Sequence, residues 1–154
     1  MNTTKGSPLG TNKETARNPL DVRIILAVLW VAGMLSSLMG DAYRLADPVV
    51  QKALLANTAS FVAPPELILV FSLIFAGSVF MSVLTLTLKS PASRWANRIV
   101  GIIFAIIPLV FWVLHLFVWR SAGYEIVWAT AQLVFALLVV WYAWKWKNPE
   151  SESF

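Results

Sequence analysis

The sequence predicts an all-α integral membrane protein, an antiparallel four-helix bundle with a short amphipathic helix in its first outer loop. Four hydrophobic segments of membrane-spanning length fill most of the 154 residues. A hydrocarbon core of about 30 Å needs about 20 apolar residues of helix. Apolar residues make up 58% of the chain and charged residues only 13%, about half of the share in a soluble domain. Lipid around the chain limits the spanning structures to helices or closed barrels.

The hydrophobic segments define four spans. They run from Val22 to Gly40, from Leu67 to Leu88, from Ile99 to Trp119 and from Ile126 to Trp144. The first helix is expected to begin near Pro19, with Asp21 in its first turn, and to end near Gly40-Asp41. The transmembrane domain is therefore predicted over residues 21–147.

Two of the three links are short. Residues 89–97 are basic and are expected to turn at Ser90-Pro91. Residues 120–125 are expected to form a tight turn through Gly123. Spans joined by links of this length are antiparallel neighbours.

The link over residues 41–65 is the longest and is predicted to hold the amphipathic helix. Asp47 is expected to be its N-cap and Pro48 its first residue. The helix should run to about Ala59, lie on the outer membrane surface or cap the bundle, and stop before Pro64-Pro65.

The charges predict an orientation in the bacterial inner membrane. Nine lysines and arginines fall on one side of the spans and three on the other, Arg44, Lys52 and Arg120. By the positive-inside rule both termini should be cytoplasmic. Residues 1–20 are predicted to be a disordered cytoplasmic tail and residues 148–154 a second, short one.

Composition excludes several kinds of chemistry. Cysteine is absent and His115 is the single histidine, so neither a disulfide nor a metal site is expected. No cofactor is predicted, and one histidine for several serines argues against a nucleophilic enzyme. The basic residues are scattered over loops, which argues against nucleic-acid binding.

Polar residues from all four spans converge at the outer end. A rise of about 1.5 Å per residue puts Asp41, Glu66, His115 and Glu125 at about 26–35 Å from the cytoplasmic basic residues of their own spans. The functional hypothesis is an outward-facing polar pocket in which an arginine pairs with a carboxylate. The alternative is ordinary charge at helix ends, which meet headgroups and water. The candidate ligand-binding residues are Asp41, Arg44, Glu66, Trp112, His115, Arg120, Glu125 and Gln132.

Deeper in the bundle the polarity is mild. Gln132 shares a helix face with Glu125, and Trp112 lies one turn from His115. Pro108 should bend the third span and can widen a cavity there. Close packing is the alternative for the small residues on these faces. No carboxylate lies near the midplane, where proton-coupled carriers usually place one.

Three pieces of sequence carry a resemblance to a known family. They are Gly40-Asp41, the segment Leu88-Lys89 to Arg94-Trp95-Ala96-Asn97 with Gly101, and Trp141-Tyr142-Ala143-Trp144-Lys145-Trp146. Over residues 22–147 the chain resembles a bacterial family of small four-span membrane proteins known as a domain of unknown function. The resemblance implies a four-helix membrane protein without an assigned activity. In that family's pattern a Glu stands where this chain has Gln132. The architecture is also distantly similar to DoxX-like proteins.

The favoured interpretation is a non-enzymatic membrane protein. It would bind a lipid-like or small amphiphilic ligand at the outer pocket, or serve as a small membrane subunit or homo-oligomer, with membrane lipid as its other partner. One alternative is a small transporter or channel component, which needs a water path to the cytoplasmic side. The other is a quinone-linked redox enzyme that depends on His115.

Overall fold

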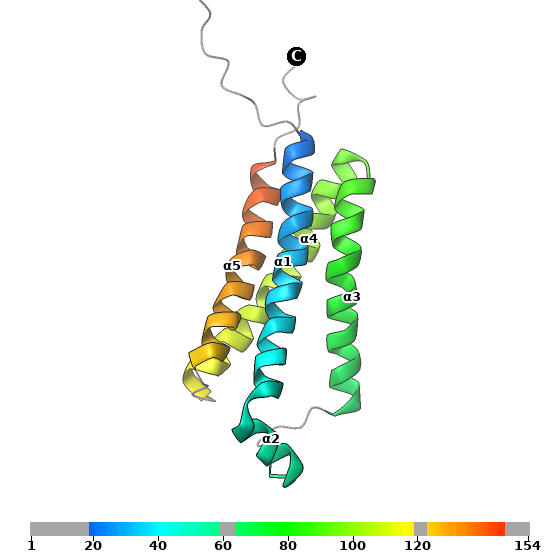
Figure 1. Cartoon of the computed structure of the whole chain (residues 1–154). Coiled ribbons are helices and arrows are strands. Elements are labelled where there is room, and N and C mark those ends of the chain that lie inside the picture. The colour runs from blue at the N-terminus through cyan, green and yellow to red at the C-terminus, as the bar shows by residue number, and fades with distance from the viewer. Residues whose placement is uncertain (1–18, 59–63, 119–122, 147–154) are drawn as a thin grey trace, which may run out of the picture.

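Four long helices lie side by side in the computed structural model, which describes residues 19–58, 64–118 and 123–146 (Figure 1). The elements are α1 (Pro19–Ala46), α2 (Pro48–Leu55), α3 (Pro65–Thr87), α4 (Ser90–Val113), the π-helix η1 (Leu114–Val118), which continues α4, and α5 (Gly123–Lys145). Each long helix is long and apolar enough to cross a bilayer. The predicted all-α four-helix bundle is confirmed, and the chain is a multi-pass integral membrane protein.

The helices are arranged around the bundle in the order α3, α1, α5, α4. α1 packs against both α3 and α5, α5 packs against α4, and a smaller contact between α3 and α4 closes the ring. The start of α1, the link from α3 to α4 and the end of α5 lie together at one end (Figure 1). We call it the arginine end, after Arg23, Arg94 and Arg98, and the opposite end the α2 end.

At the arginine end, the side chain of Arg98 binds the C-terminal end of α5. The Nε atom of Arg98 donates to the carbonyl of Ala143 at 3.0 Å, at the end of α5. Its guanidinium lies 4.9 Å from the centre of the Trp144 ring and 5.6 Å from that of Trp95. A cation at this position donates hydrogen bonds to carbonyls that the helix leaves unpaired, and it interacts favourably with the negative end of the helix dipole.

Helices α1 and α2 each end at a different residue from the one predicted. α1 does not end at Gly40-Asp41 but continues to Ala46, because the chain meets no helix-breaking residue before Asp47-Pro48. The start of α2 is as predicted: Asp47 is its N-cap, and its carboxylate accepts from the N–H of Val49 at 2.8 Å. α2 ends at Leu55 instead of Ala59, and Asn57 follows with a left-handed φ of 57°.

The third span begins nine residues earlier than predicted. α4 starts at Ser90, so the link from α3 is only Leu88-Lys89. Pro91 does not turn the chain but lies in the first turn of the helix, where its fixed φ suits helix geometry and no N–H is needed. α5 likewise begins at Gly123 instead of Ile126. The predicted tails fall outside the described residues, except that Pro19 and Leu20 begin α1.

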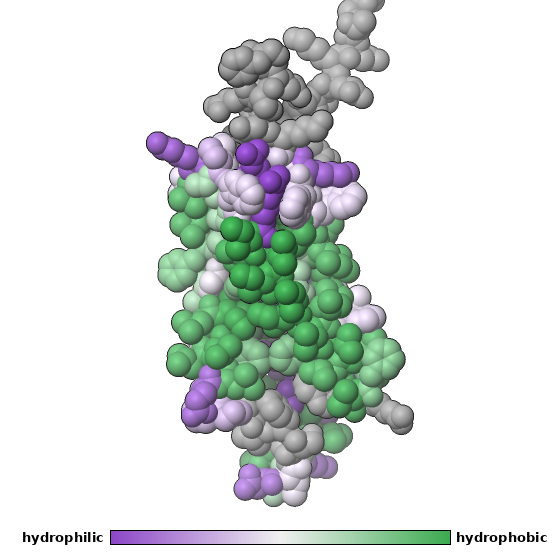
Figure 2. Space-filling view, turned by 180° about the vertical axis from the view of Figure 1, so that it is seen from behind, coloured by the Kyte–Doolittle hydropathy of each residue, from purple (hydrophilic) through white to green (hydrophobic). Residues whose placement is uncertain are grey.

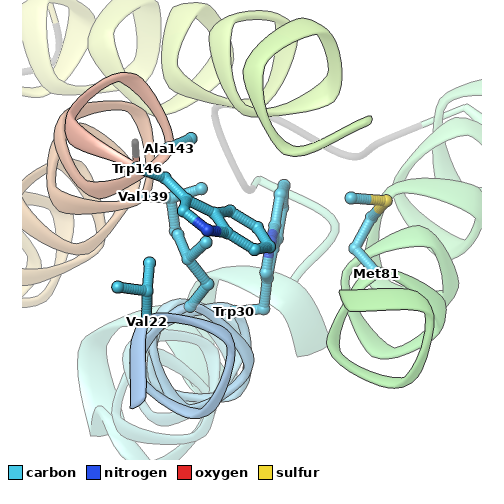
Figure 3. Close-up of a cluster of buried hydrophobic side chains, with 7 residues drawn as sticks. Val22, Trp30, Met81, Val139, Ala143 and Trp146 are labelled. Carbon is cyan, nitrogen blue, oxygen red and sulfur yellow. The ribbon is translucent and has the colours of Figure 1, made fainter. Parts of the chain in front are cut away.

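The buried core lies in the half of the bundle nearest the arginine end. Its apolar members are Val22, Leu26, Trp30, Met81, Val139, Ala143 and Trp146. Figure 3 shows the side chains of Trp30, Trp146 and Met81 pointing into the space between the helices. Every described residue classed as buried lies in this half or within about one turn of it. The α2 half is therefore the less tightly filled of the two.

On the face of the bundle that Figure 2 shows, apolar side chains form a broad belt with polar residues at both ends. Large apolar residues such as Phe80, Leu73 and Val28 are exposed. In water this surface would be unstable, but lipid tails solvate apolar side chains and the helices satisfy their own backbone groups. The surface thus agrees with the membrane location of the fold.

Candidate functional site

Three of the candidate residues meet at the α2 end. The Oε1 atom of Glu125 lies 3.7 Å from the Nε atom of Arg44, and its Oε2 atom lies 3.9 Å from the Nδ1 atom of His115. The side chain of Glu125 is 16% exposed, that of His115 19% and that of Arg44 45%. We call these residues, which come from α1, η1 and α5, the Glu125 cluster. Three charged or ionisable side chains from three elements thus lie together at this end of the bundle, with Glu125 within ion-pair distance of the other two.

Local structure brings each member of the Glu125 cluster into place. Arg44 is on a helix because α1 continues past Gly40. Glu125 lies in the first turn of α5, where the helix dipole favours a carboxylate. His115 lies in η1, where the hydrogen bonds of α4 slip to a wider π turn. Such turns are rare and occur often at functional sites, and the sequence carries no signal for this one.

The start of α2 is held close to the Glu125 cluster. The hydroxyl of Tyr124 donates to the Oδ2 atom of Asp47 at 3.0 Å. The rings of Tyr43 and Trp128 stack with 5.9 Å between their centres. The N–H of Val49, and then the Tyr124 hydroxyl, hold the pKa of the Asp47 carboxyl below its ordinary value. Sequence reasoning identified Asp47 as a cap but missed its contact with α5.

Two other candidate carboxylates are placed differently. Asp41 lies one turn before Arg44 on α1, so the two side chains share a helix face. Glu66 is exposed in the first turn of α3. Among the described residues, no lysine, arginine or histidine lies within ion-pair distance of Glu66. The structure thus brings Asp41 near the cluster and leaves Glu66 apart.

The remaining candidates lie on α4 and α5 or outside the described residues. The indole nitrogen of Trp112 donates to the Oγ1 atom of Thr130 at 2.9 Å and so joins α4 to α5. Arg120 lies outside the described residues. Gln132 is two turns from Glu125 on α5, or about 10 Å along the helix.

A cavity of about 50 Å³ lies between the four helices at the depth of Gln132. Its lining is mostly apolar, with polar groups from Ser78, Trp30 and Gln132; Pro108 also lines it. Within the part of the chain that the structure describes, the amide of Gln132 has no hydrogen-bond partner. The cavity has room for a few water molecules or a small chemical group, but is far below the size of a pocket for a drug-sized molecule.

An aromatic pair joins α3 and α4 on the side of this cavity nearest the α2 end. The rings of Phe71 on α3 and Phe111 on α4 have centres 5.7 Å apart. Each lies about one turn from a residue that lines the cavity, Phe75 and Pro108 respectively. The pair therefore contributes to the packing between α3 and α4 beyond the cavity.

Comparisons of the chain with protein-family models, curated proteins and solved structures found no match. The fold and site define a class: a multi-pass, all-α membrane protein with a charged cluster at one end and a small, mostly apolar cavity between its helices.

Proposed function

We propose that the protein binds a small amphiphilic, lipid-like molecule from the leaflet at its α2 end. The observation that carries the proposal is the convergence of Arg44, His115 and Glu125 at one end of the bundle, together with a cavity lined by Gln132, whose amide has no hydrogen-bond partner among the described residues. A polar head would exchange hydrogen bonds with the cluster. A slender part of the same molecule would pass the Phe71–Phe111 pair and reach Gln132.

The uneven packing of the bundle supports this direction of access. The half of the bundle nearest the arginine end is filled by side chains such as Trp30 and Trp146. The half nearest the α2 end contains the partly exposed Glu125 cluster. Among the described residues, none that lies more than about one turn beyond the middle of the bundle towards this end is buried. A ligand therefore has less packing to disrupt when it comes from the α2 end.

The same packing disfavours the alternative of a transporter or channel. A water path would have to continue from Gln132 to the arginine end, and the side chains of Leu26, Trp30 and Val139 occupy that half. The quinone-linked alternative has only His115 to support it. Membership of the four-span family is a further proposal, which rests on the sequence resemblance, and a homo-oligomeric or subunit role is another.

The proposed orientation has the arginine end in the bacterial cytoplasm, with the protein in the inner membrane. Basic residues support it. Five described ones lie at the arginine end, Arg23, Lys89, Arg94, Arg98 and Lys145, and two at the α2 end, Arg44 and Lys52. This is the bias of the positive-inside rule. Labelling of single cysteines at positions 52 and 89 from outside intact cells would test it, since only the first should react.

Mass spectrometry of the gently purified protein tests the binding proposal. The amount of co-purifying amphiphile is expected to fall at least about tenfold in Gln132→Leu and in Glu125→Gln, since each removes one polar contact. Glu66→Gln is the matched control, because it neutralises an exposed carboxylate at the same end. Equal amounts in all four proteins, or none in the wild type, would rule the proposal out.

A further inference from the structure

A second potential binding surface lies on the lipid-facing side of α1 and α3. It is a shallow, open groove of about 360 Å³. We call it the α1–α3 groove. Its lining residues are Ala27, Val28, Val31, Ala32, Leu35, Ser82, Val83 and Leu86. Ser82 is the one polar residue, and its hydroxyl already donates to the carbonyl of Val79 at 2.7 Å. The groove therefore offers an almost wholly apolar surface.

The groove has the length of a lipid tail within one leaflet. From Ala27 to Leu35 it extends over eight residues of α1, or about 12 Å. Half of a hydrocarbon core is about 15 Å. Val28 and Val31 are 60% and 40% exposed, so the groove opens towards the lipid. It begins one turn from Arg23 and so belongs to the leaflet at the arginine end.

Two cations lie at the arginine end of the groove. Arg23 is four residues before Ala27, on the same face of α1. Its Nη2 atom donates to the carbonyl of Leu88, at the end of α3. The guanidinium therefore crosses the end of the groove, and its centre lies 5.9 Å from the centre of the Trp146 ring. The exposed Lys89 follows Leu88 directly.

These cations have unused capacity for an anion. The Nε atom of Arg23 is buried and lacks a hydrogen-bond partner in the described parts of the chain. Among the carboxylates whose side chains the structure describes, within residues 22–58, 64–118 and 123–146, none lies within 4.0 Å of Arg23 or Lys89, since both ion pairs found there are at the α2 end. Arginine and lysine are the usual partners of phosphate, arginine through two parallel hydrogen bonds.

The positive charge at the arginine end favours a lipid over a second copy of the chain as the occupant of the groove. Two copies in one membrane share an orientation, so a symmetric dimer through the groove would bring the two arginine ends together. Each carries Arg23, Lys89, Arg94, Arg98 and Lys145, and like charges at close range oppose association. An anionic lipid supplies the opposite charge and an acyl chain together.

We infer that the α1–α3 groove is a binding site for an anionic phospholipid of the leaflet at the arginine end. The phosphate is held by Arg23 and Lys89. One acyl chain lies along the groove, against Val28 and Val31 of α1 and Val83 of α3. This site is distinct from the Glu125 cluster, because it lies at the opposite end of the bundle and faces the lipid.

Native mass spectrometry with defined lipids tests the site. The delipidated protein is mixed with phosphatidylglycerol or with phosphatidylcholine of the same acyl chains. We expect at least about tenfold more bound phosphatidylglycerol, and loss of that preference in Lys89→Gln and Arg23→Gln. Val31→Trp, which fills the groove from an exposed position, should reduce binding of both lipids. Lys145→Gln is the matched control and should bind as the wild type does.

Three results would overturn the inference. They are equal binding of the two lipids, wild-type binding by Lys89→Gln, and a loss of dimers in Val31→Trp without a change in bound lipid. Arg23→Gln also loses the contact with Leu88 and can unfold. Lys89→Gln, at an exposed position, and Arg23→Lys, which keeps the charge and should keep the preference, avoid this problem.

Discussion

The indole nitrogen of Trp30 lies 2.8 Å from the Oδ1 atom of Asn97 and donates a hydrogen bond to it. Trp30 is on α1 and Asn97 on α4, two helices that lie across the bundle from each other. The amide nitrogen of Asn97 in turn donates to the Oγ1 atom of Thr85 on α3 at 3.0 Å and to the carbonyl of Ser93 at 2.8 Å. The fully buried Asn97 thus connects three helices.

Replacing Asn97 with Leu should destabilise the bundle by about 1–3 kcal/mol, because the Trp30 N–H would stay buried without a partner. Hydrogen bonds between membrane helices average about 0.6 kcal/mol, so a large effect would come from the unpaired group. Thermal unfolding in detergent measures it. Ser72→Ala, which removes an exposed hydroxyl bonded to its own helix, should leave the midpoint unchanged. An equal midpoint for Asn97→Leu and the wild type would contradict the role of this network.

Glu125→Gln should change stability by less than about 1 kcal/mol, because its partner Arg44 is half-exposed and such pairs contribute little. The same variant should lose most of the bound amphiphile, as proposed above. Unfolding midpoint and ligand content, measured on one preparation, separate the two effects. A fall of many degrees together with loss of ligand would indicate a structural role instead.

Acid should weaken the attachment of α2 to α5. The pKa of Asp47 is lowered from its ordinary 3.8, first by the Val49 N–H and then by the Tyr124 hydroxyl. A lowered pKa in the fold means a stabilisation that is fully present above about pH 4 and is lost as the pH falls below 3.8 through the lowered value. Hydrogen exchange at the Val49 amide should therefore quicken in that range. Asp47→Asn should flatten this pH dependence, and an unchanged profile would exclude Asp47 as its source.

Two glycines on α1 should respond differently to alanine. A Cβ at Gly40 would lie 3.2 Å from the Cβ of Trp128, an atom fixed to the backbone of α5, whereas one at Gly33 would lie 3.7 Å from the Cβ of Phe135. Gly40→Ala should cost about 1–2 kcal/mol, because α1 and α5 must separate. Gly33→Ala should be neutral or stabilise by up to about 1 kcal/mol through helix propensity. Unfolding in detergent compares the two, and equal midpoints would show that α5 moves freely.

The sequence predicted the number, order and antiparallel arrangement of the spans, because the length of a hydrophobic run depends directly on bilayer thickness. It misplaced the end of α1 and the start of α4 by six and nine residues, since Gly40-Asp41 and Ser90-Pro91 suit turns as well as helices. A cap with a local signature, such as Asp47-Pro48 before α2, could be predicted, whereas a helix that continues through residues typical of turns could not.

The position of the candidate site along the helices could be predicted from the sequence, but the partners within its ion pairs could not. A constant helical rise is enough to place Arg44, His115 and Glu125 at one end of the bundle. Which of the carboxylates meets Arg44 depends on how α1 and α5 are rotated. The direction of the His115 side chain depends on the π turn at the end of α4, which the sequence does not indicate. The bond from Trp30 to Asn97 links residues 67 positions apart, and no local pattern indicates it.

The Asn97 network and the Trp30 ring both lie in the half of the bundle nearest the arginine end. Because that half is fixed, thermal bending of the long helices accumulates as displacement at their far tips. A rigid base with movable tips would let a bilayer of changing thickness or lateral pressure alter the site without unfolding any helix.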